Sequence, residues 1–136
     1  RIRFVDYQGA RLAPYAYDLA ALLKDPYMNI PAAMRDTLCE EYRAALAELD
    51  YPLNTEEFRR HYVLASLQRG MQALGAYGFL SLTKGKMKYL DYAAPCLELL
   101  ADGLENSPFV FTLLKELCAK AREVLPARIK LCRESK

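Results

Sequence analysis

Two short stretches near the start of the chain decide the expected fold: FVDYQGA at residues 4–10 and PYAYDLA at residues 14–20. The first follows directly on Arg1-Ile2-Arg3, and the apolar alternation of residues 1–5 is typical of a strand. A lone strand or hairpin is marginal in water. We therefore expect that this strand either pairs with another chain or is preceded by further sequence, and we favour the second interpretation.

Helical periodicity dominates the rest of the chain. A first helix is predicted from about Tyr15 to Leu23, where an Asp-Pro pair ends it. Four more are expected: one from Pro31, one capped by Asn54 and running to about Leu74, one from near 86–92 with Pro95 inside it, and one opened by Ser107-Pro108 and ended by Pro126. Their predicted apolar faces are Met34, Leu38, Tyr42, Leu46 and Leu49; Phe58, Tyr62, Ala65, Leu67, Met71 and Leu74; Leu97, Leu100 and Leu104; and Val110, Leu114, Leu117, Ala121 and Val124.

These patterns predict a mainly α fold with a short N-terminal strand or hairpin. We expect a single domain over residues 1–136, with the strand and a candidate metal-binding loop at 1–14, a helical subdomain at 15–126 and a basic tail at 127–136.

Composition excludes several classes of function. The chain has 136 residues, a net charge of +2 and no basic block, which gives no case for nucleic acid or an acidic membrane. No apolar run approaches the roughly 20 residues that span a bilayer. The four cysteines form no C-x-x-C pair, so a structural zinc site is not expected. Cys39, Cys96 and Cys118 lie among apolar neighbours and are predicted core side chains. Scattered thiols favour a cytoplasmic location.

Asp6 is the first candidate functional residue. It follows an apolar strand and precedes a turn, which would place a carboxylate at the mouth of a sheet. Mg²⁺ is commonly held there by one or two carboxylates together with nucleotide phosphates. On spacing alone, however, a turn-initiating aspartate that bonds nearby backbone is the more common structure. Asp18 has a similar ambiguity, because a carboxylate in a first helical turn commonly caps amides and meets the positive end of the helix dipole.

Together the two stretches resemble the C-terminal lobe of the aminoglycoside phosphotransferase family, whose fold is protein-kinase-like. The pattern is Val-Asp-Tyr-Gln-Gly-Ala at residues 5–10, a short loop, and Pro-Tyr-Ala-Tyr-Asp-Leu-Ala at 14–20. With Gln8 in the motif, the sequence is most similar to the branch of bacterial cell-wall amino-sugar kinases of the N-acetylmuramate type. Leu-Gln-Arg at 67–69, followed by Gly75, and the segment from Gly85 to Leu90 also resemble that branch.

The resemblance implies a role for each matching residue. Asp6 corresponds to the aspartate that holds Mg²⁺ in kinases, and Gln8 lies where it could contact a phosphate or a water near that metal. Asp18 corresponds to an aspartate that braces the catalytic loop and does not itself react. Arg69 and Lys86 match positions whose task the resemblance does not assign, and solvated cations are the simpler interpretation. Tyr15, Tyr17 and Arg69 are candidates for an acceptor pocket, although most of the ten tyrosines are expected to pack in the core.

The resemblance therefore implies an ATP-dependent and Mg²⁺-dependent transferase that phosphorylates a small-molecule acceptor, a sugar or amino sugar, of the kind used in cell-wall recycling. The catalytic loop with its general base, the Gly-rich loop and the ATP-pairing lysine lie upstream of Asp6 in this family and are not found in these 136 residues. We accordingly expect no catalytic base in this chain and no activity of the chain alone. The alternative from another class is a non-catalytic helical protein-interaction domain.

Overall fold

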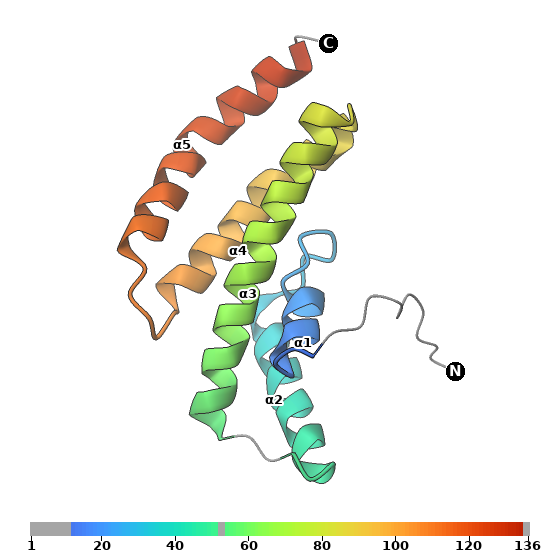
Figure 1. The fold of residues 1–136 in the computed structure, drawn as a ribbon, viewed down its shortest axis with the longest axis vertical. Coiled ribbons are helices and arrows are strands. Elements are labelled where there is room, and N and C mark those ends of the chain that lie inside the picture. Colours follow the sequence, from blue (N-terminus) through green and yellow to red (C-terminus); the bar gives the residue numbers. More distant parts are fainter. Residues whose placement is uncertain (1–11, 52–53, 135–136) are drawn as a thin grey trace, which may run out of the picture.

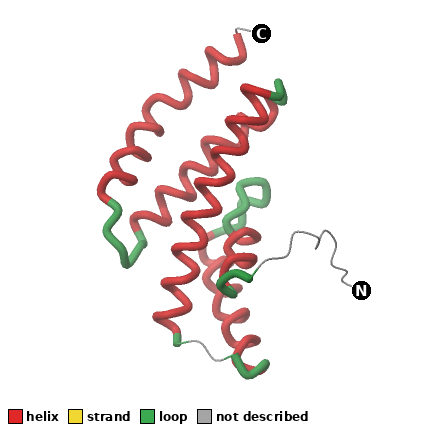
Figure 2. Tube along the Cα trace, viewed as in Figure 1, coloured by secondary structure: helices red, strands yellow, loops and turns green. Residues whose placement is uncertain are grey.

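The computed structural model describes residues 12–51 and 54–134, and every regular element within those ranges is helical (Figures 1 and 2). The predicted mainly α fold is thus confirmed, while the strand expected at residues 1–5 lies outside the described residues. The elements are α1 (Ala16–Leu23), α2 (Ala32–Glu48), α3 (Thr55–Gly78), a π-helical turn η1 (Phe79–Thr83), a 3-10 helix η2 (Met87–Tyr92), α4 (Ala93–Glu105) and α5 (Thr112–Glu134).

Helix α3 is the centre of the arrangement. Helices α1 and α4 both pack against it, and α5 packs on α4, so that α3, α4 and α5 form a row in Figure 1. No described helix is long and apolar enough to cross a bilayer.

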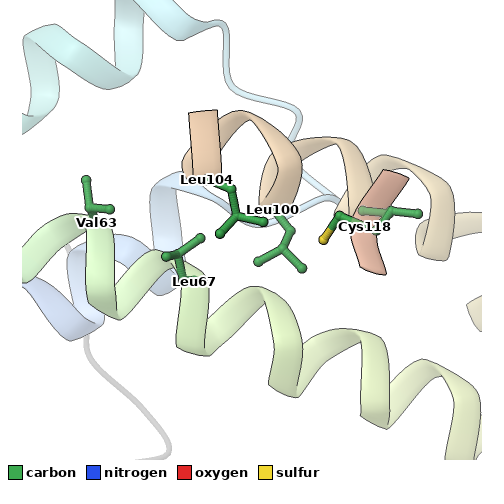
Figure 3. Packing of buried hydrophobic residues seen from close by; sticks show 6 residues of the cluster. Val63, Leu67, Leu100, Leu104 and Cys118 are labelled. Atoms are coloured by element: carbon green, nitrogen blue, oxygen red, sulfur yellow. The ribbon is translucent and has the colours of Figure 1, made fainter. Parts of the chain in front are cut away.

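The main core lies between α3 and α4 and is closed by α5. Leu67 on α3 and Leu100 and Leu104 on α4 are buried, and Cys118 of α5 meets them (Figure 3). Leu97, Leu100 and Leu104 recur at three- and four-residue spacing, which puts them on one side of α4, as predicted. Each Å² of apolar surface removed from water contributes about 25 cal/mol, so the burial of such side chains is the main contribution to the stability of the fold.

A second apolar cluster joins α1 and α2 to the first half of α3. Ala16, Leu19, Leu23 and Phe58 are its buried members. Leu38, Cys39 and Tyr42 of α2 pack against them, but α2 has no fully buried residue. Of its predicted stripe, Met34 and Leu49 are exposed, so that part of the prediction is wrong. Met34 lies in the first turn of α2 and Leu49 directly follows the helix, on either side of the stretch that contacts the cluster.

Helix α3 begins as predicted and ends later than predicted. The Asn54 side chain caps it by accepting a hydrogen bond from the Glu56 amide at 2.8 Å. The helix runs past Leu74 through Gly75 to Gly78, and the chain turns only at Gly85, whose φ of 68° suits glycine. A helical glycine costs about 1 kcal/mol relative to alanine. Tyr77, which lies between the two glycines, is buried.

The predicted bounds of the last helix are wrong at both ends. Ser107 and Pro108 do not open it, because the Ser107 hydroxyl accepts from the Phe109 amide at 3.0 Å and closes a local turn instead. Helix α5 begins at Thr112 and continues through Pro126 to Glu134. A proline inside a helix removes one backbone hydrogen bond. Pro126 is solvent-exposed, so water can satisfy the carbonyl that loses its partner.

The buried face of α5 also differs from the prediction. Leu114, Cys118, Ala121 and Leu125 pack toward α4, whereas Val110 lies outside the helix and is 89% exposed. Leu117 and Val124, predicted as core, are also exposed. Helix α5 has a second apolar row beside the buried one, and the two cannot be ranked by spacing alone.

Candidate functional site

The two residues expected nearest the metal, Asp6 and Gln8, lie outside the described residues. Asp18 is described: it is solvent-exposed in the first turn of α1, where a carboxylate favours the helix dipole. Its side chain makes no hydrogen bond or ion pair to any residue in the described ranges. Together with burial, its charge raises the pKa of the nearby Tyr42 hydroxyl.

Arg69 and Tyr17 come together although 52 residues separate them. The Arg69 guanidinium carbon lies 5.6 Å from the centre of the Tyr17 ring, a cation–π distance. Its Nη1 donates to Gln72 Oε1 at 2.7 Å and approaches the Tyr17 hydroxyl at 3.5 Å. The Tyr17 hydroxyl in turn donates to the same Gln72 oxygen at 3.3 Å. We call Tyr17, Arg69 and Gln72 the Tyr17 cluster.

The local sequence explains the cluster. Arg69 and Gln72 are three residues apart on α3 and therefore share one face of that helix. Tyr17 reaches this face because α1 packs against α3 through Ala16, Leu19 and Leu23. Gln72 was not singled out in the sequence. Its i, i+3 spacing from Arg69 is the signal that could have found it.

The Tyr17 cluster can present donors to a polar ligand. Arg69 forms its hydrogen bonds to described residues through Nη1. Its Nε is buried and has no hydrogen-bond partner among them. The positive charge is not paired with any carboxylate in the described ranges. Nη2 makes no hydrogen bond to a described residue, so it is the Arg69 nitrogen that can donate to a hydroxyl or an anionic group.

Tyr15, the third predicted acceptor residue, lies elsewhere. Its ring is 5.5 Å from the Tyr51 ring, and its carbonyl accepts from the Tyr42 hydroxyl at 2.8 Å. Tyr15 thus contacts the α2 side of α1, whereas Tyr17 contacts α3. Lys86 is exposed, and its carbonyl accepts a long hydrogen bond of 3.4 Å from the Ser81 hydroxyl.

Four other tyrosines pack against one another near η2. Tyr27 lies 4.1 Å from Tyr92 between ring centres, and Tyr77 lies 6.0 to 6.2 Å from Tyr27, Tyr92 and Tyr89. Burial and a hydrogen bond with Tyr27 raise the pKa of Tyr77. Tyr77 is buried, but Tyr27 is 47% exposed, so the core role expected for most of the tyrosines holds for Tyr77 and is wrong for Tyr27.

The described residues supply no activated nucleophile. Burial raises the pKa of the Cys96 thiol to about 11 and also raises the pKa values of Cys39 and Cys118. A raised pKa keeps a thiol protonated and inert. Cys96 and Cys118 are buried, at 1% and 4% exposure, and Cys39 is half-buried against the second apolar cluster, which confirms the core role predicted for these three cysteines. Within the described ranges, no three carboxylate, thiol or imidazole groups gather as metal ligands.

Comparison with known proteins relates the chain to amino-sugar kinases. It is 28% identical over 88 residues to an N-acetylmuramate/N-acetylglucosamine kinase of Pseudomonas aeruginosa, with 63% of this chain and 26% of that protein covered. A protein of the same name from Neisseria meningitidis serogroup B is 31% identical over 87 residues, which cover 62% of this chain and 26% of the relative. The matched stretch thus spans about a quarter of the length of these curated relatives.

No protein-family model matches the chain. No solved structure matches it either. The similarity to the kinases is therefore the relationship on which function can be argued.

Proposed function

We propose that this chain is the helical, acceptor-side part of an ATP-dependent kinase that phosphorylates a hydroxyl of a sugar or amino sugar. The observation that supports it best is the Tyr17 cluster. The two segments that resemble the kinase branch, PYAYDLA at 14–20 and LQR at 67–69, are far apart in sequence and meet at Tyr17 and Arg69. The curated relatives, which are N-acetylmuramate/N-acetylglucosamine kinases, point to the same acceptor class.

In this proposal Asp6 holds Mg²⁺, which would neutralise charge on the nucleotide phosphates, and Gln8 contacts a phosphate or a bound water. Because both residues lie outside the described ranges, the assignment rests on the sequence motif. Asp18 acts as a positioning residue that braces the loop bearing the general base. Its exposed carboxylate at the start of α1, without a partner among the described residues, is available for that contact.

The acceptor side of the proposed site is the Tyr17 cluster. Tyr17 and Gln72 fix Arg69, so that its Nη2 group can donate to a hydroxyl, amide or carboxylate oxygen of an amino sugar. A side chain held in place before binding loses little entropy when the ligand arrives. The structure gives no support for including Tyr15 in this pocket, since its contacts are with Tyr42 and Tyr51.

The general base and most of the nucleotide cradle would come from other parts of the complete enzyme. The rival, a non-catalytic interaction domain, accounts less well for a guanidinium locked by polar groups from two distant segments. A domain that binds its partner through apolar surface would not require that arrangement.

An ATP-consumption assay on the full-length protein tests the proposal. N-acetylmuramate, N-acetylglucosamine, a neutral hexose and an aminoglycoside serve as separate acceptors. We expect turnover with at least one amino sugar and its loss when ATP is omitted. Turnover with the aminoglycoside alone would show that the acceptor is an aminoglycoside and not a simple sugar. No turnover with any acceptor would favour the interaction domain.

A further inference from the structure

A second site lies beside the first half of α3, nearer the start of that helix than the Tyr17 cluster. A cavity of about 630 Å³ opens between α2 and α3 beneath the end of α4. This volume is in the range of small-molecule sites, roughly 300–1,000 Å³. Tyr17, Arg69 and Gln72 do not line it. Its lining includes Lys24, Arg35, Tyr62, Ser66 and Asp102.

Two largely buried cations converge inside this cavity. The side chains of Lys24 and Arg35 are only 12% and 13% exposed. Both address one oxygen of Asp102: Lys24 Nζ lies 3.0 Å and Arg35 Nη2 lies 3.7 Å from Oδ2. Arg35 Nη1 donates to the Ile30 carbonyl at 2.6 Å, which fixes the guanidinium in place. These cations come from opposite ends of the loop between α1 and α2, so the fold itself brings them together.

One carboxylate does not balance two cations. Asp102 is 48% exposed, and its other oxygen accepts from Asn106 Nδ2 at 3.0 Å. The remaining charges of the lining lie at the solvent-exposed rim. Glu40 pairs with Arg43 at 2.9 Å, and Asp36 and Arg59 offset each other in net charge. The inner end of the cavity therefore has an excess of one positive charge, and taking a cation out of water is costly without a counter-charge.

We infer that this cavity binds the phosphate monoester of a small polar molecule. Its phosphate group lies against Lys24 and Arg35, which are a point charge and a planar fork, the two types of donor that proteins use for phosphate. A monoester carries between one and two negative charges at neutral pH and compensates the excess. Asp102 is the competitor for the same donors. The body of the ligand extends along α3, over Tyr62 and the polar Ser66 and Thr55.

The site is separate from the proposed phosphotransfer and does not depend on it. Phosphate binding here involves neither Asp6 nor the Tyr17 cluster, so the 136-residue chain suffices to test it.

The test measures the melting temperature of the chain in sodium phosphate, in glucose 6-phosphate and in sodium chloride of equal ionic strength. A ligand that binds only the folded state raises the melting temperature with concentration. We expect both phosphates to raise it above chloride, with glucose 6-phosphate acting at lower concentration because its sugar also contacts the cavity. If inorganic phosphate acts at the same concentration, the site takes free phosphate and the monoester assignment is wrong.

Four variants separate binding from a general salt effect, since phosphate also stabilises proteins by exclusion from their surface. Lys24→Met and Arg35→Met should lose the difference between phosphate and chloride, while Lys115→Met, whose cation pairs with Glu105 outside the cavity, should keep it. Asp102→Asn should give a larger rise than the wild type, because the competing carboxylate is gone.

Titration of ³¹P chemical shifts on the same proteins gives the dissociation constant directly and covers a variant that folds poorly. We expect Asp102→Asn to bind glucose 6-phosphate at least threefold more tightly than the wild type. An equal response of the wild type and all variants, or unchanged binding in Asp102→Asn, would overturn the inference.

Discussion

At the scale of single residues, the structure adds partners to positions that the sequence only marked. Arg69 matched a kinase branch without a role, and the geometry shows it fixed by the Tyr17 ring and Gln72. In the sequence Gln72 is marked only by its i, i+3 spacing from Arg69, and the packing of α1 on α3 makes its oxygen the shared acceptor. The role of Asp18 stays a prediction, because its expected partner belongs to a loop not found in this chain.

Replacing Arg69 tests the acceptor side of the proposed site. If the full-length protein is the proposed kinase, Arg69→Gln should raise its KM for the amino sugar by about 10-fold to 100-fold, since a charged hydrogen bond contributes roughly 1.5–3 kcal/mol. The KM for ATP should stay within a few-fold. Arg60→Gln is the matched control, because Arg60 is an exposed cation of the same helix that lies over Phe109. Equal changes in both variants would contradict an acceptor role for Arg69.

The raised pKa of the Cys96 thiol should make the stability of the fold depend on pH. Burial raises its pKa from 9.0 to about 11, so the folded state retains a proton that the unfolded chain releases. This contribution is complete below pH 9 and is lost as the pH rises through about 11. The free energy of unfolding should therefore fall more steeply between these values in the wild type than in Cys96→Ala.

Urea denaturation at several alkaline pH values checks this. Tyr62, Cys39 and Cys118, whose pKa values are also raised, are common to both proteins and cancel in the comparison. Parallel pH profiles would show that Cys96 does not titrate in this window.

At the scale of elements, the sequence predicted most where one apolar row was unambiguous. Leu97, Leu100 and Leu104 were placed correctly because α4 has a single row of large apolar residues. Helix α5 has adjacent rows, and Leu117 was assigned to the core where Cys118 lies instead. The start of α5 was misplaced for a local reason: Ser107 has the side chain of a typical cap but bonds within its own turn.

The contact between α3 and α4 depends on small residues at two points. A Cβ at Gly103 would lie 3.2 Å from Leu67 Cδ2, and one at Gly70 would lie 3.3 Å from Leu100 Cδ1. These glycines let the two helices approach closely enough for Leu67 and Leu100 to be buried.

Replacing Gly103 and Gly75 by alanine should change the free energy of unfolding in opposite directions. We expect Gly103→Ala to destabilise the chain by about 1 kcal/mol, because crowding of buried Leu67 outweighs the gain in helix propensity. Gly75→Ala, with nothing within 4 Å of the new Cβ, should stabilise it by up to about 1 kcal/mol. Chemical denaturation measures both; stabilisation by Gly103→Ala would mean that α3 and α4 pack more loosely than the structure shows.

At the scale of the whole molecule, α3 links the parts. Its first half closes the cluster with α1 and α2, its middle forms the core with α4, and Arg69 lies on its face toward α1. The sequence predicted this helical body well. It could not predict the cavity between α2 and α3, because that depends on how loosely α2 packs.

The central claim is phosphoryl transfer to an amino sugar by the enzyme to which this chain contributes. Asp6→Asn in the full-length protein tests it most directly, because asparagine keeps the size of the side chain and removes the charge that would hold Mg²⁺. The product is followed by mass spectrometry after incubation with ATP, Mg²⁺ and N-acetylmuramate or N-acetylglucosamine, and circular dichroism verifies the fold of the variant. We predict a sugar phosphate with the wild type and at least a hundredfold less with Asp6→Asn at unchanged helicity. A wild type that phosphorylates neither sugar, or a variant within a few-fold of the wild-type rate, would contradict the account.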